Sequence, residues 1–282
     1  MNNRGFTLVE LVVALVISGF LAGVVFQLVR GQERFVSMQS AREEVQQNGR
    51  AALELISAEL RAASREGIRT ATADSIRFRV PRIWGLVCGD PAAAATPGPT
   101  TRAIVFPGLG LAAFRGSSVP DSVAIRDSTS TLPRRWRFAS VTDATPSAGQ
   151  GAAACAGLGP DAGRVQVRTL TGVPDSIPLH VGEPAYLFEV VKYDADDSNV
   201  PGKWVRRNAD GGGAQPLAGP LAIEDDVPVF RFRYFDAAGA EVTPPITDPT
   251  TIAEVQVRVT TMSRSSKPLL EFSDSTRVRL RN

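Results

Sequence analysis

The chain contains few of the residues that most often act in catalysis or metal binding. Its 282 residues include one histidine, two cysteines and three methionines. A Ser-His or Cys-His catalytic pair, or a histidine-based metal site, would depend on His180 alone. That residue lies in the strand-like run SIPLHV, where we interpret it as a solvated or hydrogen-bonded side chain. We find no nucleophile with a base and no paired carboxylates, so the sequence indicates neither an enzyme nor a cofactor.

Lysine is also scarce, and the charge is nearly balanced. The 31 basic residues are almost all arginine, and the net charge is +2. This charge is too small to indicate a nucleic-acid surface. A hydrophobic content of 43% and a charged content of 21% describe a globular protein with one membrane-like segment.

That segment runs from Phe6 to Val29, long enough to span a bilayer, and it contains Glu10. A carboxylate in hydrocarbon costs about 2.5–3.5 kcal/mol even on insertion scales. The run is longer than the apolar region of an ordinary secretory signal, and no A-x-A cleavage site follows it. A plain transmembrane anchor has the right length but leaves Glu10 unexplained.

The contiguous motif Arg4-Gly5-Phe6-Thr7-Leu8-Val9-Glu10, followed at once by the apolar run, resembles the processing site of type IV prepilins and type II secretion pseudopilins. The resemblance implies that prepilin peptidase cuts after Gly5 and methylates the new amino terminus at Phe6. The leader, residues 1–5, would be lost on the cytoplasmic side, where Arg4 agrees with the positive-inside rule.

The resemblance also provides a partner for Glu10. After cleavage this glutamate is the fifth residue of the helix, about 6 Å along the axis from the terminal amine. The amine is mostly cationic at neutral pH. In a filament of parallel helices, the amine of one subunit can pair with Glu10 of its neighbour, and removing one partner would cost about 3–5 kcal/mol. The alternative is a glutamate that snorkels to the headgroups.

Beyond the apolar run, the sequence predicts a helix that continues to about Ala63. One face is apolar, formed by Met38, Ala41, Val45, Ala52, Ile56, Leu60 and Ala63. Charged residues, including Glu54 and Glu59, are spread over the remainder. Asn48-Gly49 is the expected weak point, because glycine costs about 1 kcal/mol in a helix interior. We expect the apolar face to pack on the protein's own sheet.

After Gly67 the apolar residues alternate, which is typical of strands with one covered face. Eight strands are expected, at 75–80, 102–106, 122–126, 164–170, 185–193, 228–235, 253–259 and 275–281. Loops rich in small residues are expected at 88–101 and 143–163, and the glycine-rich run NADGGGAQPLAGP is read as a flexible loop. The expected fold is α+β, a long N-terminal helix packed on an antiparallel β-sheet head, as in pilins.

The resemblance and the expected fold together imply four parts: a leader (1–5), a transmembrane and assembly helix (6–29), an amphipathic helix (30–66) and a β-rich globular head (67–282). The chain would cross the bacterial inner membrane once, with its head outside the cytoplasm, and then enter a periplasmic or cell-surface filament. In that oxidising compartment we expect Cys88 and Cys155 to form a disulfide. Two unpaired thiols are the alternative.

One acidic cluster could bind a metal. Asp194, Asp196 and Asp197 group oxygens as a calcium loop does, but the glycine and distal glutamate of an EF-hand are missing. A polar hairpin turn between AYLFEVVKY and KWVRR is the favoured interpretation.

The C-terminal stretch VPVFRFRYFDAAGAEVTPP resembles J-type minor pseudopilins and W-type minor pilins, and QQNGRAALELISAELRAA is closer to the W-type. The resemblance implies a minor subunit that helps to initiate or cap a type IV pilus or a type II secretion pseudopilus. Its partners would be other minor pilins or pseudopilins, the major pilin, prepilin peptidase and the inner-membrane assembly platform. The alternative is a displayed binding module that recognises a surface, DNA or a secreted protein.

Overall fold

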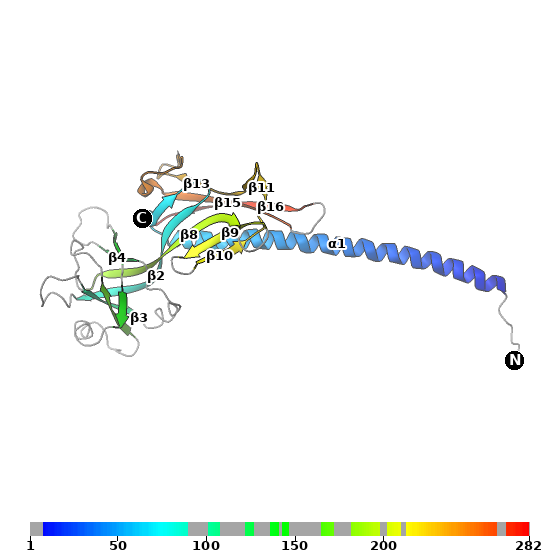
Figure 1. Ribbon diagram of the computed structural model, residues 1–282, viewed down its shortest axis with the longest axis horizontal. Coiled ribbons are helices and arrows are strands. Elements are labelled where there is room, and N and C mark those ends of the chain that lie inside the picture. Colours follow the sequence, from blue (N-terminus) through cyan, green and yellow to red (C-terminus); the bar gives the residue numbers. More distant parts are fainter. Residues whose placement is uncertain are drawn as a thin grey trace.

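The structure is a computed structural model, and it describes ten stretches of the chain: residues 8–89, 101–107, 122–126, 136–140, 143–146, 165–171, 182–197, 202–209, 213–263 and 269–281. It confirms the α+β fold. One long helix at the N-terminus is followed by a head of antiparallel β-sheets, the arrangement found in pilins (Figure 1).

The helix α1 runs from Leu8 to Ala62 without a break. Its 55 residues span about 80 Å. The expected weak point at Asn48-Gly49 does not interrupt it, because both residues contact the head. A Cβ atom on Gly49 would lie 3.0 Å from Cδ1 of Phe272, and the Asn48 amide donates a hydrogen bond to the carbonyl of Gly219. The close approach of Phe272 explains why glycine is accommodated in a helix interior.

The larger sheet contains ten strands: β1 (Ile68–Ala71), β2 (Ile76–Gly89), β3 (Thr101–Pro107), β4 (Ser122–Arg126), β5 (Trp136–Ser140), β6 (Asp143–Pro146), β7 (Val165–Thr171), β8 (Pro184–Asp197), β9 (Lys203–Ala209) and β10 (Gly213–Ala218). Their order is β10-β9-β8-β2-β3-β7-β6, with β1 paired to β2 and the β4–β5 pair joined to β8. The fourteen-residue strands β2 and β8 lie side by side and extend beyond the end of α1 (Figure 1).

The smaller sheet lies at the C-terminus and has the order β14-β13-β15-β16. Its strands are β13 (Phe230–Phe235), β14 (Glu241–Val242), β15 (Glu254–Met262) and β16 (Glu271–Arg279). A separate hairpin pairs β11 (Ile223–Glu224) with β12 (Val227–Pro228). Two short 3-10 helices, η1 (Arg65–Gly67) and η3 (Pro249–Thr251), complete the described elements.

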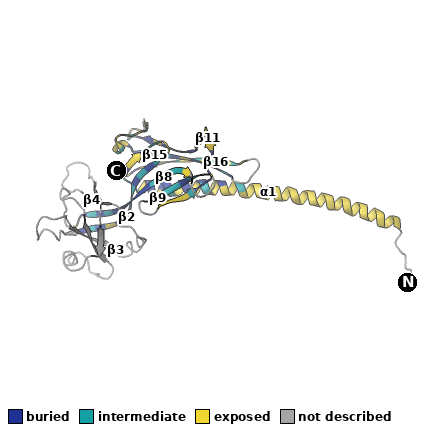
Figure 2. Cartoon of the chain, viewed as in Figure 1, coloured by how far each residue is buried: buried dark blue, intermediate teal, exposed yellow. Residues whose placement is uncertain are grey.

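The core lies where the second half of α1 meets both sheets (Figure 2). Ile56 and Leu60 of the helix have no exposed surface, and they share one cluster with Phe78 and Tyr193 of the larger sheet and Tyr234 of the smaller one. The expected apolar face of the helix is confirmed from Val45 onward. Ala41 is half-buried and Met38 is exposed, so the contact with the head begins later than the apolar pattern suggests.

All eight expected strands are present, but three expectations about their surroundings were wrong. β2 continues past Pro81 to Gly89. The strand has a bulge between Pro81 and Ile83, and a bulge is a site where a sheet tolerates proline. The glycine-rich run expected to be a loop contains β10, which pairs with β9. The segment 143–163, also expected to be a loop, begins with β6.

Candidate functional site

The exposed half of α1, residues 8–40, presents an apolar surface that is unfavourable in water. Every residue in it is exposed, and an 18-residue window within the helix reaches a mean hydropathy of 2.6 with none of it buried. Leu8 is 81% exposed and Phe20 is 73% exposed. Since apolar patches of this extent mark membrane or protein contacts, this half of the helix requires lipid or other helices around it.

Glu10 lies in the first turn of the described helix, on this apolar surface. It is exposed, and so are Val9 and Leu11 beside it in the chain. Gly5 and Phe6 lie outside the described residues, so the cleavage and methylation sites rest on the sequence. The Cys88–Cys155 disulfide also stays a prediction, because the backbone of Cys88 belongs to β2 but Cys155 lies outside the described residues.

The buried half of α1 is joined to the larger sheet by a charged cluster centred on Glu59. One of its carboxylate oxygens, Oε1, lies 2.5 Å from Nη2 of Arg82 and 2.9 Å from Nη2 of Arg207. The other, Oε2, accepts a hydrogen bond of 2.5 Å from the Tyr193 hydroxyl. Glu189 completes the cluster, because its Oε2 lies 2.6 Å from Arg82 and 2.9 Å from Arg207.

Strand geometry brings these groups together. Glu189 and Tyr193 of β8 share the face that carries Val191, and Tyr193 lies directly opposite Arg207 of β9. Arg82 stands at the bulge of β2, between the paired residues Pro81 and Ile83. Three strands therefore present one hydroxyl, two guanidinium groups and one carboxylate to the helix.

The cluster shifts the titration of its members. Burial alone would raise the pKa of Glu59, but the hydrogen bonds from Arg207, Tyr193 and Arg82 outweigh it and lower the pKa. Burial and the negative charge of Glu59 both raise the pKa of the Tyr193 hydroxyl. Glu59 is therefore ionised and Tyr193 is neutral at neutral pH.

Sequence reasoning missed this cluster by assigning Glu59 to the solvent side of the helix. The residue is 6% exposed. A signal was present, since Glu59 follows Ile56 by three residues and precedes Ala63 by four, the spacing of the buried face. A charge at such a position requires partners, but those partners lie 23 to 148 residues away in the chain.

The acidic residues considered for calcium belong to the predicted hairpin. β8 and β9 pair in register, with Asp197 opposite Lys203. The Asp194 carboxylate contacts Lys192 at 2.7 Å and Arg206 at 3.0 Å, and Asp196 contacts Arg206 at 2.9 Å. Within the described stretches, no group of three or more His, Cys, Asp or Glu residues is placed to hold a metal ion.

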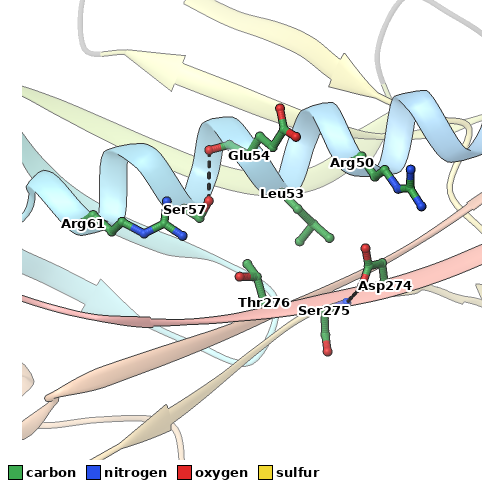
Figure 3. Close-up of a pocket in the computed structure, with 8 residues that line it drawn as sticks. All are labelled: Arg50, Leu53, Glu54, Ser57, Arg61, Asp274, Ser275 and Thr276. Carbon is green, nitrogen blue, oxygen red and sulfur yellow. Dashed lines mark hydrogen bonds between the residues drawn. The ribbon is translucent and has the colours of Figure 1, made fainter.

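An open cleft of about 420 Å³ lies between neighbouring parts of α1 and β16 (Figure 3). Leu53 points into it from the helix, and polar or charged side chains make up the rest of its lining: Arg50, Glu54, Ser57, Arg61, Asp274, Ser275 and Thr276. Because both signs of charge are present and the cleft is open, its chemistry selects no particular ligand.

Comparison with known families matches residues 1–26 to the prokaryotic N-terminal methylation motif. The chain is prepilin-like. The match covers Gly5, Phe6, Glu10 and most of the apolar run, and it implies processing by prepilin peptidase and assembly into a pilus-like filament. It ends before the head begins. Neither curated proteins nor solved structures include a significant match to the chain.

Proposed function

We propose that this chain is a minor pilin or pseudopilin that helps to initiate or cap a type IV pilus or a type II secretion pseudopilus. The observation that supports the proposal is the methylation motif at residues 1–26, joined to an apolar helix that stands clear of the head as far as Ser40. The first feature provides processing, and the second provides a surface for neighbouring helices.

In this proposal the exposed half of α1 has two successive environments. It first holds the subunit in the inner membrane, because about 20 apolar residues span the hydrocarbon. It then enters a bundle of parallel helices and exchanges lipid for the side chains of other pilins or pseudopilins. The head, joined to the helix by the ion pairs of Glu59, remains outside the membrane throughout.

Glu10 determines the axial position of the subunit in that bundle. In a low-dielectric surrounding, only a neighbour whose terminal amine lies at the same height neutralises the carboxylate. A subunit at the extreme tip has nothing above it and needs no such carboxylate. The presence of Glu10 therefore supports a place below the tip, with at least one partner above.

The test is to replace Glu10 with valine in cells that assemble the filament. Glu10→Val should insert into the membrane at least as well as wild type, because an apolar group replaces a carboxylate. Mass spectrometry should still find a mature chain that begins at methylated Phe6. Incorporation into the filament should be lost, because the neighbour's amine no longer has a counter-charge.

Glu33→Val is the matched control, since Glu33 is an exposed glutamate of the same helix beyond the apolar run. It should assemble normally. Assembly of Glu10→Val at the wild-type level would assign Glu10 to the headgroup region instead, and an unprocessed Met1 terminus in cells that contain the peptidase would overturn the whole proposal.

A further inference from the structure

The C-terminal sheet has a basic outer face. Alternate residues of β13, β15 and β16 point toward α1, and the intervening ones point to the solvent. Strand register therefore gathers arginines that look scattered in the sequence onto the outer face: Arg231, Arg233, Arg258, Arg277 and Arg279. We call this group the arginine face.

Two of these arginines have carboxylate partners. Arg233 pairs with Glu241, and Nε of Arg277 lies 2.5 Å from Oε2 of Glu254. Both ion pairs lie toward the end of the sheet where β14 joins β13.

The central pair of the arginine face is different. Arg231 and Arg258 are direct cross-strand neighbours, an arrangement in which like charges destabilise a sheet. The Arg231 guanidinium donates to the carbonyls of Pro228 and Phe230, and Nε of Arg258 donates to the Ser273 hydroxyl at 3.3 Å. In the part of the chain that the structure describes, neither guanidinium forms an ion pair with a carboxylate.

The same molecule displays an acidic tip. The β11–β12 hairpin projects beside the C-terminal sheet (Figure 1) and presents Glu224, Asp225 and Asp226, all exposed. Asp225 and Asp226 have φ angles of 50° and 61°, the left-handed pair that a tight hairpin turn requires. No cation among the described residues forms an ion pair with these carboxylates. Ile223 and Val227, 48% and 41% exposed, flank the tip.

We infer that the arginine face of one chain binds the Glu224–Asp226 tip of a second copy of the chain. The charges are complementary. Arg258 and the three acidic residues of the tip are exposed, and Arg231 is half-buried. The base of the hairpin also contacts the arginine face, through the hydrogen bond from Arg231 to Pro228. Because the two surfaces adjoin, one two-fold axis allows both copies to exchange tips, and such closed pairs are the commonest symmetric assemblies.

A protein partner fits this face better than a nucleic acid does. Glu241, Glu254 and Glu271 lie toward the two ends of the sheet, where they would repel a continuous polyanion that crosses the arginine face. The net charge of the chain is only +2. A compact acidic tip can reach Arg231 and Arg258 without approaching these carboxylates.

Exposed ion pairs are individually weak and are screened by salt. The contact should therefore form mainly where α1 holds two heads at the same height in one membrane, which raises their effective concentration. It requires only two chains in a shared membrane, so it does not depend on incorporation into a filament.

The experiment measures energy transfer between fluorescently labelled heads of full-length chains in neutral lipid vesicles. The face variant is Arg231→Glu with Arg258→Glu. The tip variant is Glu224→Arg with Asp225→Asn and Asp226→Asn, because asparagine tolerates the left-handed turn. Each variant alone should lower the specific transfer by about fivefold. An equal mixture of the two should restore it, since the reversed face then meets the reversed tip.

The matched control exchanges two exposed charges of α1 outside the arginine face, Arg42→Glu with Glu43→Arg, and should leave the transfer unchanged. Urea unfolding of each variant verifies that its head is folded. Transfer that survives in both variants, or a mixture no better than its components, would overturn the inference. Loss in the face variant alone, or displacement of the pair by a single-stranded oligonucleotide at physiological salt, would assign the arginine face to a different partner.

Discussion

The two halves of α1 form one continuous helix, yet their burial is the reverse of what their hydrophobicity suggests. Residues 8–40 include the most apolar segment of the chain, and every one of them is exposed. Residues 41–62 are far more polar, and eight of them are buried. Burial here depends on whether the chain itself provides a partner. The head provides one for the second half, and the first half must find its partner in lipid or in another subunit.

Each half also contains a glutamate at a site where charge is costly. Glu59 is neutralised by Arg82 and Arg207 of its own head. For Glu10 we propose the terminal amine of a neighbouring chain. In both cases the cost of an unpaired charge makes the carboxylate selective for one geometry, within the subunit for Glu59 and between subunits for Glu10.

Removing the buried carboxylate of Glu59 should have the largest effect on the attachment of the second half of α1 to the head. Glu59→Ala should lower the free energy of unfolding of the head by about 3–5 kcal/mol, because Arg82 and Arg207 lose their central counter-charge and Tyr193 loses its acceptor. Urea unfolding of the full chain in detergent, followed by tryptophan fluorescence, measures the change. Glu54→Ala, an exposed glutamate of the same helix, should stay within about 0.5 kcal/mol of wild type.

A leucine-to-alanine substitution in each half of α1 tests directly which half packs on the head. Leu60 has no exposed surface, whereas Leu21 is 57% exposed. Leu60→Ala should destabilise the head by about 2–5 kcal/mol through lost burial and a cavity. Leu21→Ala should leave the unfolding midpoint of the head unchanged in the same assay. Equal losses for the two variants would mean that the exposed half also packs on the head.

The sequence was sufficient for the long helix and eight strands, but not for every strand or for the contacts between elements. Helical spacing and alternation depend on local order, so the long helix and eight strands could be predicted from residues such as Ile56 and Val257. The burial of Glu59 could not, because it depends on Arg82 and Arg207, which only the sheet topology brings to the helix. Strand β10 was missed for a related reason, since pairing with β9 overrides the preference of its glycine-rich sequence for a loop.

Two glycines of α1 provide a subtler test. A Cβ on Gly49 would lie 3.0 Å and 3.3 Å from ring atoms of Phe272, whereas one on Gly31 would meet nothing within 4 Å. Gly49→Leu should therefore destabilise the head by about 1–3 kcal/mol through overpacking. Gly31→Leu should not, because leucine improves helix propensity in open surroundings. A stable Gly49→Leu head would show that Phe272 can move away at little cost.

The smallest expected effect is a difference in acid sensitivity. The pKa of Glu59 is lower in the folded head than the ordinary value of 4.5, because hydrogen bonds from Arg207, Tyr193 and Arg82 outweigh the effect of burial. A carboxyl group with a depressed pKa stabilises the fold above its unfolded pKa, and this contribution disappears as the pH falls through the lower folded value. The wild-type head should therefore lose stability as the pH drops below 4.5.

Glu59→Gln has no group to titrate at this position, so its unfolding free energy should fall less steeply over the same range. Exposed carboxyl groups with lowered pKa values, such as those of Glu241 and Asp248, titrate in both proteins and cancel in the comparison. The difference in unfolding free energy between wild type and Glu59→Gln should be constant from pH 6 to 8 and should shrink below about pH 4.5. Parallel curves down to pH 3 would contradict the role of Glu59 as the charged centre of the attachment.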